Sequence, residues 1–457
     1  MKKYKFSKTY VAAVLYRYAF LLFVPVLQGL LFAKSSKGFL FTLYSTDLAL
    51  LVLLVSVAVI RCSKSSLSID KRALETKGGV IFKTCDTVIL NQRASFLFTD
   101  GLFLRLMKGC RLRVFAGSGY STAYLKQKDK NEIIRSLLPL KAKKITSSGI
   151  FRTLLMSLSF SNALTGLLAA VPLLRRVSVI MGAGQAAMLL EGKALEGILK
   201  FTGLPPVLRN ISSVLFFFWL IGFFTEFFSE YRLKFIEFSS HFYVSKGLVA
   251  KTQAVFHKSS VRMLLFRQSI LMFLLGFYSA QLRLNIKPRR KIHILSAVRG
   301  VACENLKEEI FGKSKAEAMV ISPSKSALWG YTYLPFIALS ISMAVIIFFY
   351  DNIIIKSLFA VLSGVFAVWF LFRFFALYRS SLEIRDDVFE VKYFSGMNFT
   401  RVVFGLYDVT GFEISQSLFQ KITDRCNIKI TVANVMGEKI KIKHISLKDI
   451  EKLKPRF

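Results

Sequence analysis

The chain has 457 residues, of which 54% are hydrophobic and 45 are Phe, and its formal net charge at pH 7 is +37. This composition is too apolar for an ordinary soluble protein and indicates a membrane protein. A basic chain could also bind nucleic acid, but basic segments beside apolar ones are explained by attraction to anionic lipids. We therefore expect anionic membrane lipids as partners, and no nucleic acid.

Six apolar stretches are long enough to cross a bilayer, which takes roughly 20 helical residues. In chain order they cover residues 18–33, 40–60, 154–173, 211–228, 331–349 and 353–375. Lys2, Lys3 and Lys5 before the first stretch could suggest a secretion signal, but a second stretch follows at once and no small-residue cleavage site is evident. The first stretch is therefore expected to be a retained helix, and the six stretches to form three pairs.

The basic residues predict the orientation in the membrane. Residues 62–151 contain 17 Lys or Arg against 6 acidic residues, and residues 231–330 contain 17 against 5. The loops that would lie on the opposite side carry few charges. Because Lys and Arg concentrate on the cytoplasmic side, we expect the N-terminus and the three large polar segments to be cytoplasmic.

One motif recurs in the three polar segments. It reads DGLFLRLMKGCRLRV at residues 100–114, QSILMFLLGFYSAQLRL at 268–284 and QSLFQKITDRCNIKI at 416–430. Strand-like runs surround it, with a glycine turn at Gly78 and Gly79 in the first segment and a helix-start signal at Ser446 in the third. Each segment is therefore expected to form short strands closed by one amphipathic helix, as a small barrel or sandwich.

This order of hairpins, glycine turn, motif and closing helix resembles the bacterial pleckstrin-homology (PH) domain of the second type. Two membrane helices before each of several such domains resemble the YdbT-like family of bacterial membrane proteins. The resemblance implies a seven-stranded barrel-like sheet with a C-terminal helix, a cytoplasmic location, and a binding or assembly role without known catalysis. It does not imply binding of phosphoinositides. The motif residues are expected to be mostly packing positions.

The predicted fold class is membrane α plus cytoplasmic β: three transmembrane helix hairpins, each followed by a PH-like β-barrel or sandwich with a C-terminal helix. Hairpins are expected at residues 1–62, 146–232 and 326–379, and PH-like domains at 63–145, 233–325 and 380–457. The second hairpin has a long external loop, 174–208. Its apolar part, 177–190, is short for a span and is expected to be an interfacial or re-entrant segment, either with a functional role or as filler.

The candidate binding residues form a basic cluster in a predicted turn: Lys287, Arg289, Arg290 and Lys291. Arg can bind a headgroup phosphate with two hydrogen bonds, although a solvated turn would have the same composition. Lys141, Lys143 and Lys144 also precede a span, where positive charge is explained by topology. We expect no catalytic residues, cofactor or metal, because the five cysteines and four histidines fit no metal-binding or catalytic spacing and no nucleotide-binding loop is found.

The sequence therefore favours a multi-pass protein of the bacterial inner membrane that acts as a non-catalytic binding or assembly platform. Envelope maintenance or protection against membrane-active agents would suit such a protein. Its PH-like domains could bind protein partners or self-associate through exposed strand edges. The alternative is a transporter or lipid-translocating protein with a pathway between the hairpins. Small and polar residues of the third stretch suggest it: Ser157, Ser159, Ser161, Asn162, Thr165 and Gly166.

Overall fold

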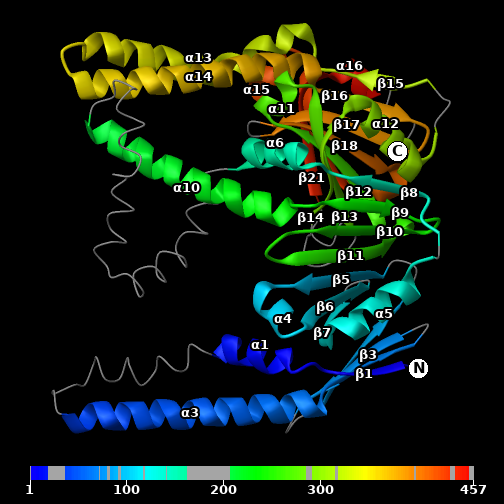
Figure 1. Cartoon of the computed structure of the whole chain (residues 1–457). Coiled ribbons are helices and arrows are strands. Elements are labelled where there is room, and N and C mark those ends of the chain that lie inside the picture. Colours follow the sequence, from blue (N-terminus) through cyan, green and yellow to red (C-terminus); the bar gives the residue numbers. More distant parts are fainter. Residues whose placement is uncertain are drawn as a thin grey trace. The chain divides into compact units, whose positions relative to one another are not determined.

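The computed structural model describes residues 2–18, 37–70, 73–79, 83–90, 94–116, 119–139, 141–161, 206–284, 291–313, 317–395, 398–432 and 438–451. The chain divides into two compact units (Figure 1), each taken by itself below. Unit 1 comprises Met1–Thr146, Lys234–Ser260 and Asn285–Arg290, and unit 2 comprises Ser147–Leu233, Val261–Leu284 and Lys291–Phe457.

Unit 1 contains two helices that precede a β-rich region, followed by strands from a distant part of the chain. Its elements are β1 (Lys2–Lys5), α1 (Thr9–Tyr18), α3 (Lys37–Lys64), β2 (Ser66–Ile69), β3 (Ala73–Gly78), β4 (Thr84–Ile89), β5 (Ser95–Asp100), α4 (Leu102–Leu106), β6 (Gly109–Ala116), β7 (Gly119–Lys126), α5 (Gln127–Leu137), β8 (Lys144–Ser147, with its last residue in unit 2), β9 (Lys234–Glu237), β10 (His241–Lys246) and β11 (Lys251–His257).

Two antiparallel sheets build unit 1. The first has the order β1-β2-β3-β4, and the second has the order β7-β6-β5-β11-β10-β9-β8. The centre of the second sheet is the pairing of β5 with β11, which runs from Asp100 opposite Lys251 to Ser95 opposite Phe256. Strands from two predicted PH-like domains therefore share one sheet, a pairing that the division into six consecutive parts did not include.

The core of unit 1 follows from the alternation of side chains along its strands. Leu67 and Leu74 of the first sheet and Phe98 and Leu112 of the second are fully buried against one another. Helix α5 closes this core with Ile133. The same helix carries the buried Lys130, which forms an ion pair with the buried Asp100 at the end of β5.

Unit 2 contains the remaining helices and two further sheets. Its elements are α6 (Ile150–Phe160), α10 (Pro206–Glu230), β12 (Val261–Gln268), α11 (Ile270–Leu274), β13 (Phe277–Leu284), β14 (Lys291–Arg299), α12 (Gly300–Phe311), β15 (Met319–Ile321), α13 (Leu328–Phe348), α14 (Ile353–Arg379), β16 (Ser381–Arg385), β17 (Val388–Ser395), β18 (Asn398–Gly405), β19 (Val409–Ser415), α15 (Leu418–Ile422), β20 (Arg425–Val432), β21 (Glu438–Ser446) and α16 (Leu447–Glu451).

The sheets of unit 2 have the orders β14-β13-β12-β18-β17-β16-β15 and β19-β20-β21. Here β12 pairs with β18, from Met263 opposite Phe404 to Gln268 opposite Phe399. The three-stranded sheet covers the other: Ile428, Ile430 and Ile440 pack into one core with Val391 and neighbouring residues. The strands after α14, with α16, thus form the expected β-rich C-terminal domain.

Among the described residues, two helices are long and apolar enough to cross a membrane, α13 and α14. They pack side by side in Figure 1 and coincide with the fifth and sixth predicted spans. Asn352 caps α14 by accepting hydrogen bonds from the backbone N–H groups of Ile354 and Ile355. The second and fourth predicted spans lie within α3 and α10. Most residues of the first and third predicted spans and of the loop 174–208 lie outside the described residues.

The recurring motif forms one short helix in each copy, namely α4, α11 and α15. The expectation that its residues mostly serve packing is wrong for α4, whereas Ile270, Leu271, Met272 and Phe273 of α11 pack in two hydrophobic clusters. Helix α4 buries none of its residues, and α11 buries only Met272. The strands on either side of each helix do supply core residues, such as Leu112 after α4 and Ile428 after α15.

Candidate anion-binding site

The candidate site of unit 1 begins with the alternation of side chains on β6 and β7. Cys110, Leu112 and Val114 point into the core, so Arg111 and Arg113 lie on the opposite face of the sheet. The antiparallel register places Tyr124 opposite Arg111, Thr122 opposite Arg113 and Tyr120 opposite Phe115. The sheet thus presents one row of arginines and one row of hydroxyl groups on a single face.

Helix α1 covers one end of this face. The Ser7 backbone N–H donates to the Tyr124 carbonyl oxygen at 2.9 Å, and the Tyr10 ring packs on the Tyr124 ring with centroids 5.4 Å apart. Gly109 makes this approach possible, because a Cβ atom there would lie 2.3 Å from Cγ2 of Thr9. The start of α1 is therefore fixed directly on the first residue of β6.

The last turn of α3 contributes the third arginine, Arg61. This end of α3 is tied to the segment before α1, since the Cys62 thiol donates to the Ser7 carbonyl oxygen. Arg61 also lies at the helix C-terminus, where a positive charge is favoured by the helix dipole.

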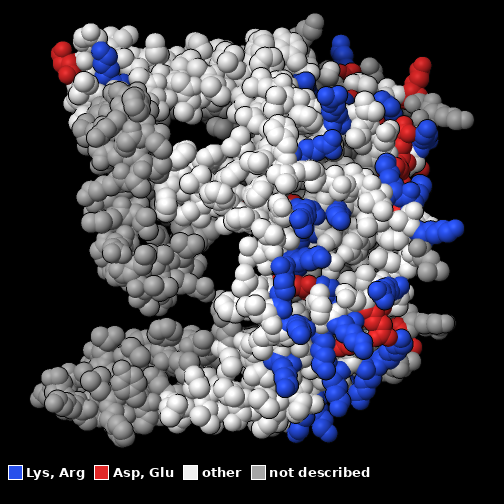
Figure 2. Space-filling model, in the orientation of Figure 1, with Lys and Arg blue, Asp and Glu red and all other residues white. Residues whose placement is uncertain are grey.

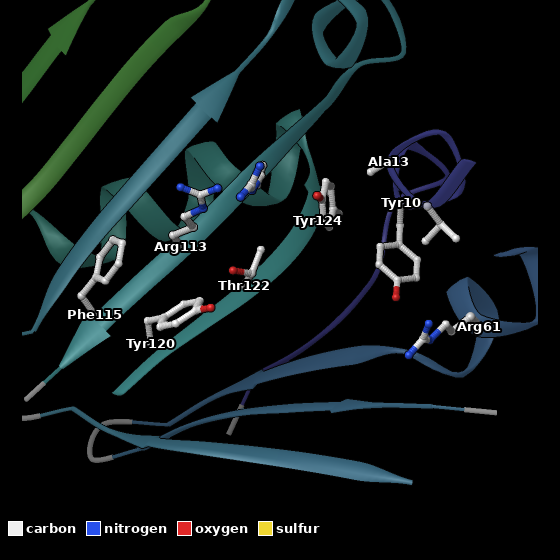
Figure 3. Close-up of a pocket in the computed structure, with 10 residues that line it drawn as sticks. Tyr10, Ala13, Arg61, Arg113, Phe115, Tyr120, Thr122 and Tyr124 are labelled. Carbon is white, nitrogen blue, oxygen red and sulfur yellow. The ribbon is translucent and has the colours of Figure 1, made fainter. Parts of the chain in front are cut away.

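Together these elements enclose a cavity of about 440 Å³ (Figure 3). A cavity of this size falls within the range of roughly 300–1,000 Å³ that holds small ligands. In Figure 3, Tyr10 and Arg61 face the cavity from the helices, and Arg113, Tyr120 and Thr122 face it from the strands. The lining residues are Tyr10, Ala13, Val14, Arg61, Arg111, Arg113, Phe115, Tyr120, Thr122 and Tyr124.

The cavity is strongly cationic. It contains three arginines and no acidic residue, and no described carboxylate lies within ion-pair distance of Arg61, Arg111 or Arg113. The Nε–H group of Arg111 is buried and has no acceptor among the described residues. A buried donor without a partner is costly, so an acceptor supplied by a ligand would be favourable here.

A second cavity, in unit 2, differs from the first in that two of its cations are paired with carboxylates. It measures about 490 Å³ and is lined by Arg379, Lys392 and Arg401 among others. Here Lys392 pairs with Glu383, and Arg401 lies 2.6 Å from Glu390. Two of its cations are thus neutralised within the protein, whereas those of the first cavity are available to an external anion.

The surroundings of the first cavity are basic as well. In Figure 2 many Lys and Arg side chains cover the sheets of unit 1, while the described part of α3 shows almost no charged atoms. Anions would therefore be attracted to the sheets at the end of an apolar helix.

The basic cluster predicted from sequence is not tested, because Lys287, Arg289 and Arg290 lie outside the described residues, and Lys291 is described only as the first residue of β14. Of the other lysines, Lys143 lies 3.4 Å from the buried Glu237 of β9. The five cysteines are free thiols, and Cys110, Cys303 and Cys426 are buried.

One cluster was not expected from sequence. Glu226 and Glu230, one turn apart on α10, and His293 on β14 place one possible ligand atom each within 4.8 Å of one another. Each of the three also interacts with other groups of the chain. The four histidines are widely spaced along the chain, and this spacing gave no sign that His293 would lie beside two carboxylates.

The arginine cavity was also missed. The alternation within the RLRV run separates Arg111 and Arg113 from the core residues. The position of α1 over this face carried no signal in the sequence, because it depends on a contact between Thr9 and Gly109, 100 residues apart in the chain.

Comparisons with known proteins bear on the C-terminal part. Residues 334–456 match the family described as the bacterial PH domain. This match begins inside α13 and covers α14, β16 to β21 and α15 to α16. No curated protein and no solved structure matches the chain. The chain thus carries a bacterial PH domain at its C-terminus, next to two apolar helices.

Proposed function

We propose that this protein is a membrane-anchored, non-catalytic binding platform of the YdbT-like kind, with its N-terminus and all three PH-like regions in the cytoplasm. The PH domain at residues 334–456 supports a binding role at a membrane, and α13 and α14 supply an anchor. Three membrane hairpins, a threefold repeat and a place in envelope maintenance belong to the same proposal. Protein partners or other copies of the chain would bind through the β-rich regions.

The ligand class that we propose for the platform is the phosphate group of anionic phospholipids. The observation that carries this is the cavity with Arg61, Arg111 and Arg113, which has no internal counter-ion among the described residues. Charge-assisted hydrogen bonds from Arg to phosphate are shorter and stronger than neutral ones. Tyr and Thr hydroxyl groups beside the arginines would donate to the remaining phosphate oxygens.

The position of the cavity favours a lipid over a soluble anion. Arg61 belongs to the last turn of α3, a 28-residue helix with long apolar runs. A headgroup at the membrane surface would therefore enter the cavity without leaving its bilayer. The described residues that line the cavity include no carboxylate or histidine.

The test uses the full chain in neutral detergent, with dioleoyl phosphatidylglycerol, dioleoyl phosphatidylcholine or sodium phosphate added. A ligand that binds the folded state raises the unfolding temperature. Phosphatidylglycerol should raise it in the wild-type chain and in the control Arg135→Gln, an exposed residue of α5. The double variant Arg111→Gln and Arg113→Gln should lose this shift.

An equal shift in the double variant would overturn the assignment of the cavity. A shift with sodium phosphate but none with phosphatidylglycerol would show a site for a free anion instead. Equal shifts with phosphatidylcholine would show that the acidic headgroup is not what the site recognises.

A further inference from the structure

The three short helices of the recurring motif expose large apolar side chains. Phe103 of α4 is 69% exposed, Leu274 of α11 is 76% exposed and Leu418 of α15 is 82% exposed. Single exposed apolar residues are common on proteins, but a contiguous group at the same point of three related segments is not. Such a group indicates a surface that is covered in the cell.

In unit 1 the exposed group extends beyond α4. Leu102, Phe103, Leu106 and Met107 are all exposed, and none of the residues of α4 reaches the core. The Arg105 guanidinium donates to the Leu248 carbonyl oxygen at 3.1 Å, which joins α4 to the turn between β10 and β11. Leu248 and Val249 of this turn are exposed too, so turn and helix form one apolar patch.

Helix α4 lies at the end of unit 1 from which α1 and α3 depart. It is followed by Lys108 and by Gly109, which is in contact with Thr9 at the start of α1. Ser7, two residues before Thr9, accepts from Cys62 near the end of α3. The patch is therefore close to the point where the apolar helices leave the sheets.

In unit 2, α11 lies against the last turns of α14. Phe273 packs with Phe372 and Ala376, and the Arg379 guanidinium lies 4.4 Å from the Phe273 ring centroid. Leu274 and Leu275, beside this contact, remain exposed. Leu274 and Leu275 therefore lie beside the last turns of α14, which is one of the two helices able to cross a membrane.

Helix α15 occupies the same level at the start of α13. The amide nitrogen of Gln420 lies 3.1 Å from Nδ1 of His444, and His444 fills the space over Gly330 in the first turn of α13. Leu418, in the same helix, is exposed. Trp329, in the same turn of α13, is exposed, as expected of aromatic residues at a membrane interface.

We propose that α4, α11 and α15 insert their exposed apolar side chains into the interfacial layer of the bilayer that α13 and α14 cross. This inference rests on the membrane anchoring in the proposed function, but not on the arginine cavity. The bilayer is the occupant favoured here, because α11 packs at the end of α14 and α15 is joined through His444 to the start of α13. Arg105 and Lys108 beside α4, and Lys421 and Arg425 at α15, would contact the headgroups, as basic residues do in interfacial helices.

The proposal also explains the recurrence of the motif. Each copy of its helix leaves large apolar side chains exposed, whereas the strands that follow it bury theirs in the core. A segment that serves as a contact with lipid in each copy would keep apolar residues on the outside. The β-rich regions would then contact the membrane surface directly, in addition to being linked to the membrane helices.

The experiment places the photoreactive residue p-benzoylphenylalanine at Phe103, Leu274 or Leu418 of the full chain. Native membranes are irradiated, and the purified protein is weighed by mass spectrometry. Two equally exposed positions serve as controls, Ile89 at 73% and Tyr407 at 86%. Ile89 is the last residue of β4, about 17 Å along the strand from its first residue, Thr84. Tyr407 follows the end of β18 that lies opposite Phe399, the residue of this strand that packs beside α14.

A mass increase of one phospholipid is expected at the three motif positions and no increase at the two controls. Cross-links to a second polypeptide at the motif positions would overturn the proposal in favour of a protein partner. Equal lipid adducts at the controls, or none at the motif positions in a chain that sediments with membranes, would also overturn it. A chain that does not sediment with membranes would instead refute the anchoring on which the proposal rests.

Discussion

At the scale of single residues, the buried and half-buried cations discussed above fall into two kinds. Lys130 is almost fully buried and paired with Asp100, and Arg401 lies between Glu304 and Glu390. These pairs occupy positions where removal of one partner would leave an uncompensated buried charge. Arg111 and Arg113 have no such partner among the described residues. This difference separates structural cations from those available to a ligand.

The contribution of a structural ion pair can be tested at Glu390 through the pH dependence of stability. Burial would raise its pKa, but Arg401 and Lys307 outweigh that effect and lower it to about 2, from an ordinary value of 4.5. Because the folded-state pKa lies below the unfolded one, Glu390 stabilises the fold above pH 4.5, and this contribution is lost as the pH falls toward 2. The shift corresponds to about 3 kcal/mol.

We expect Glu390→Gln to lower the unfolding temperature of the chain in detergent at pH 7 and to lose most of this effect at pH 2.5. The control is Glu413→Gln, which removes an exposed carboxylate paired with Lys429 in the same domain and should change little at either pH. A Glu390→Gln variant that is equally destabilised at both pH values would contradict the assignment, since the loss would then come from packing.

At the scale of elements, the contact between α1 and β6 depends on a glycine. Gly109→Ala would place a Cβ atom 2.3 Å from Thr9 Cγ2, whereas Gly101→Ala would meet nothing within 4 Å. Gly109→Ala should therefore destabilise the chain by about 1–3 kcal/mol, the usual cost of overpacking. It should also speed tryptic cleavage after Lys8, because α1 loosens.

Gly101→Ala is the matched control and should behave like the wild-type chain in both measurements. Adding Thr9→Ala to Gly109→Ala removes the two closest atoms and should restore part of the lost stability. If the Gly109→Ala variant is cleaved by trypsin as slowly as the control and is equally stable, the contact between Thr9 and Gly109 does not hold α1 in place.

The same elements show what could be predicted from sequence. Local patterns were sufficient for the strands and for α13 and α14, since alternation and apolar length are properties of neighbouring residues. The helix-start signal at Ser446 is followed by α16, which begins at Leu447. A capping box forms at Ser417, where Gln420 reciprocates, at the start of α15. Gln420 also contacts Asn427 and His444, and no local pattern places His444 beside it.

At the scale of the molecule, the sequence could not predict which strands pair. Strands usually pair with near neighbours in the chain, yet β5 pairs with β11 and β12 with β18, with more than 100 residues between partners. These two long-range pairings form the centres of the two seven-stranded sheets, so each sheet joins strands from two of the polar segments.

The expected cytoplasmic orientation can be tested through Cys85, an exposed thiol on β4. Burial raises the pKa of Cys110 and Cys303 to about 12, which leaves roughly one thiol in ten thousand ionised at pH 8. Because the thiolate is the reactive form, a membrane-impermeant maleimide should label mainly Cys85. We expect labelling in inverted vesicles, whose cytoplasmic face is outward, and none in intact spheroplasts.

The variant Cys85→Ser serves as the control and should lose most of the label in inverted vesicles, since Cys62 is only half-exposed and its pKa is raised by burial. Labelling of Cys85 in spheroplasts would reverse the orientation of unit 1. It would also place the proposed headgroup site on the opposite side of the membrane, because the arginine cavity and β4 belong to the same unit.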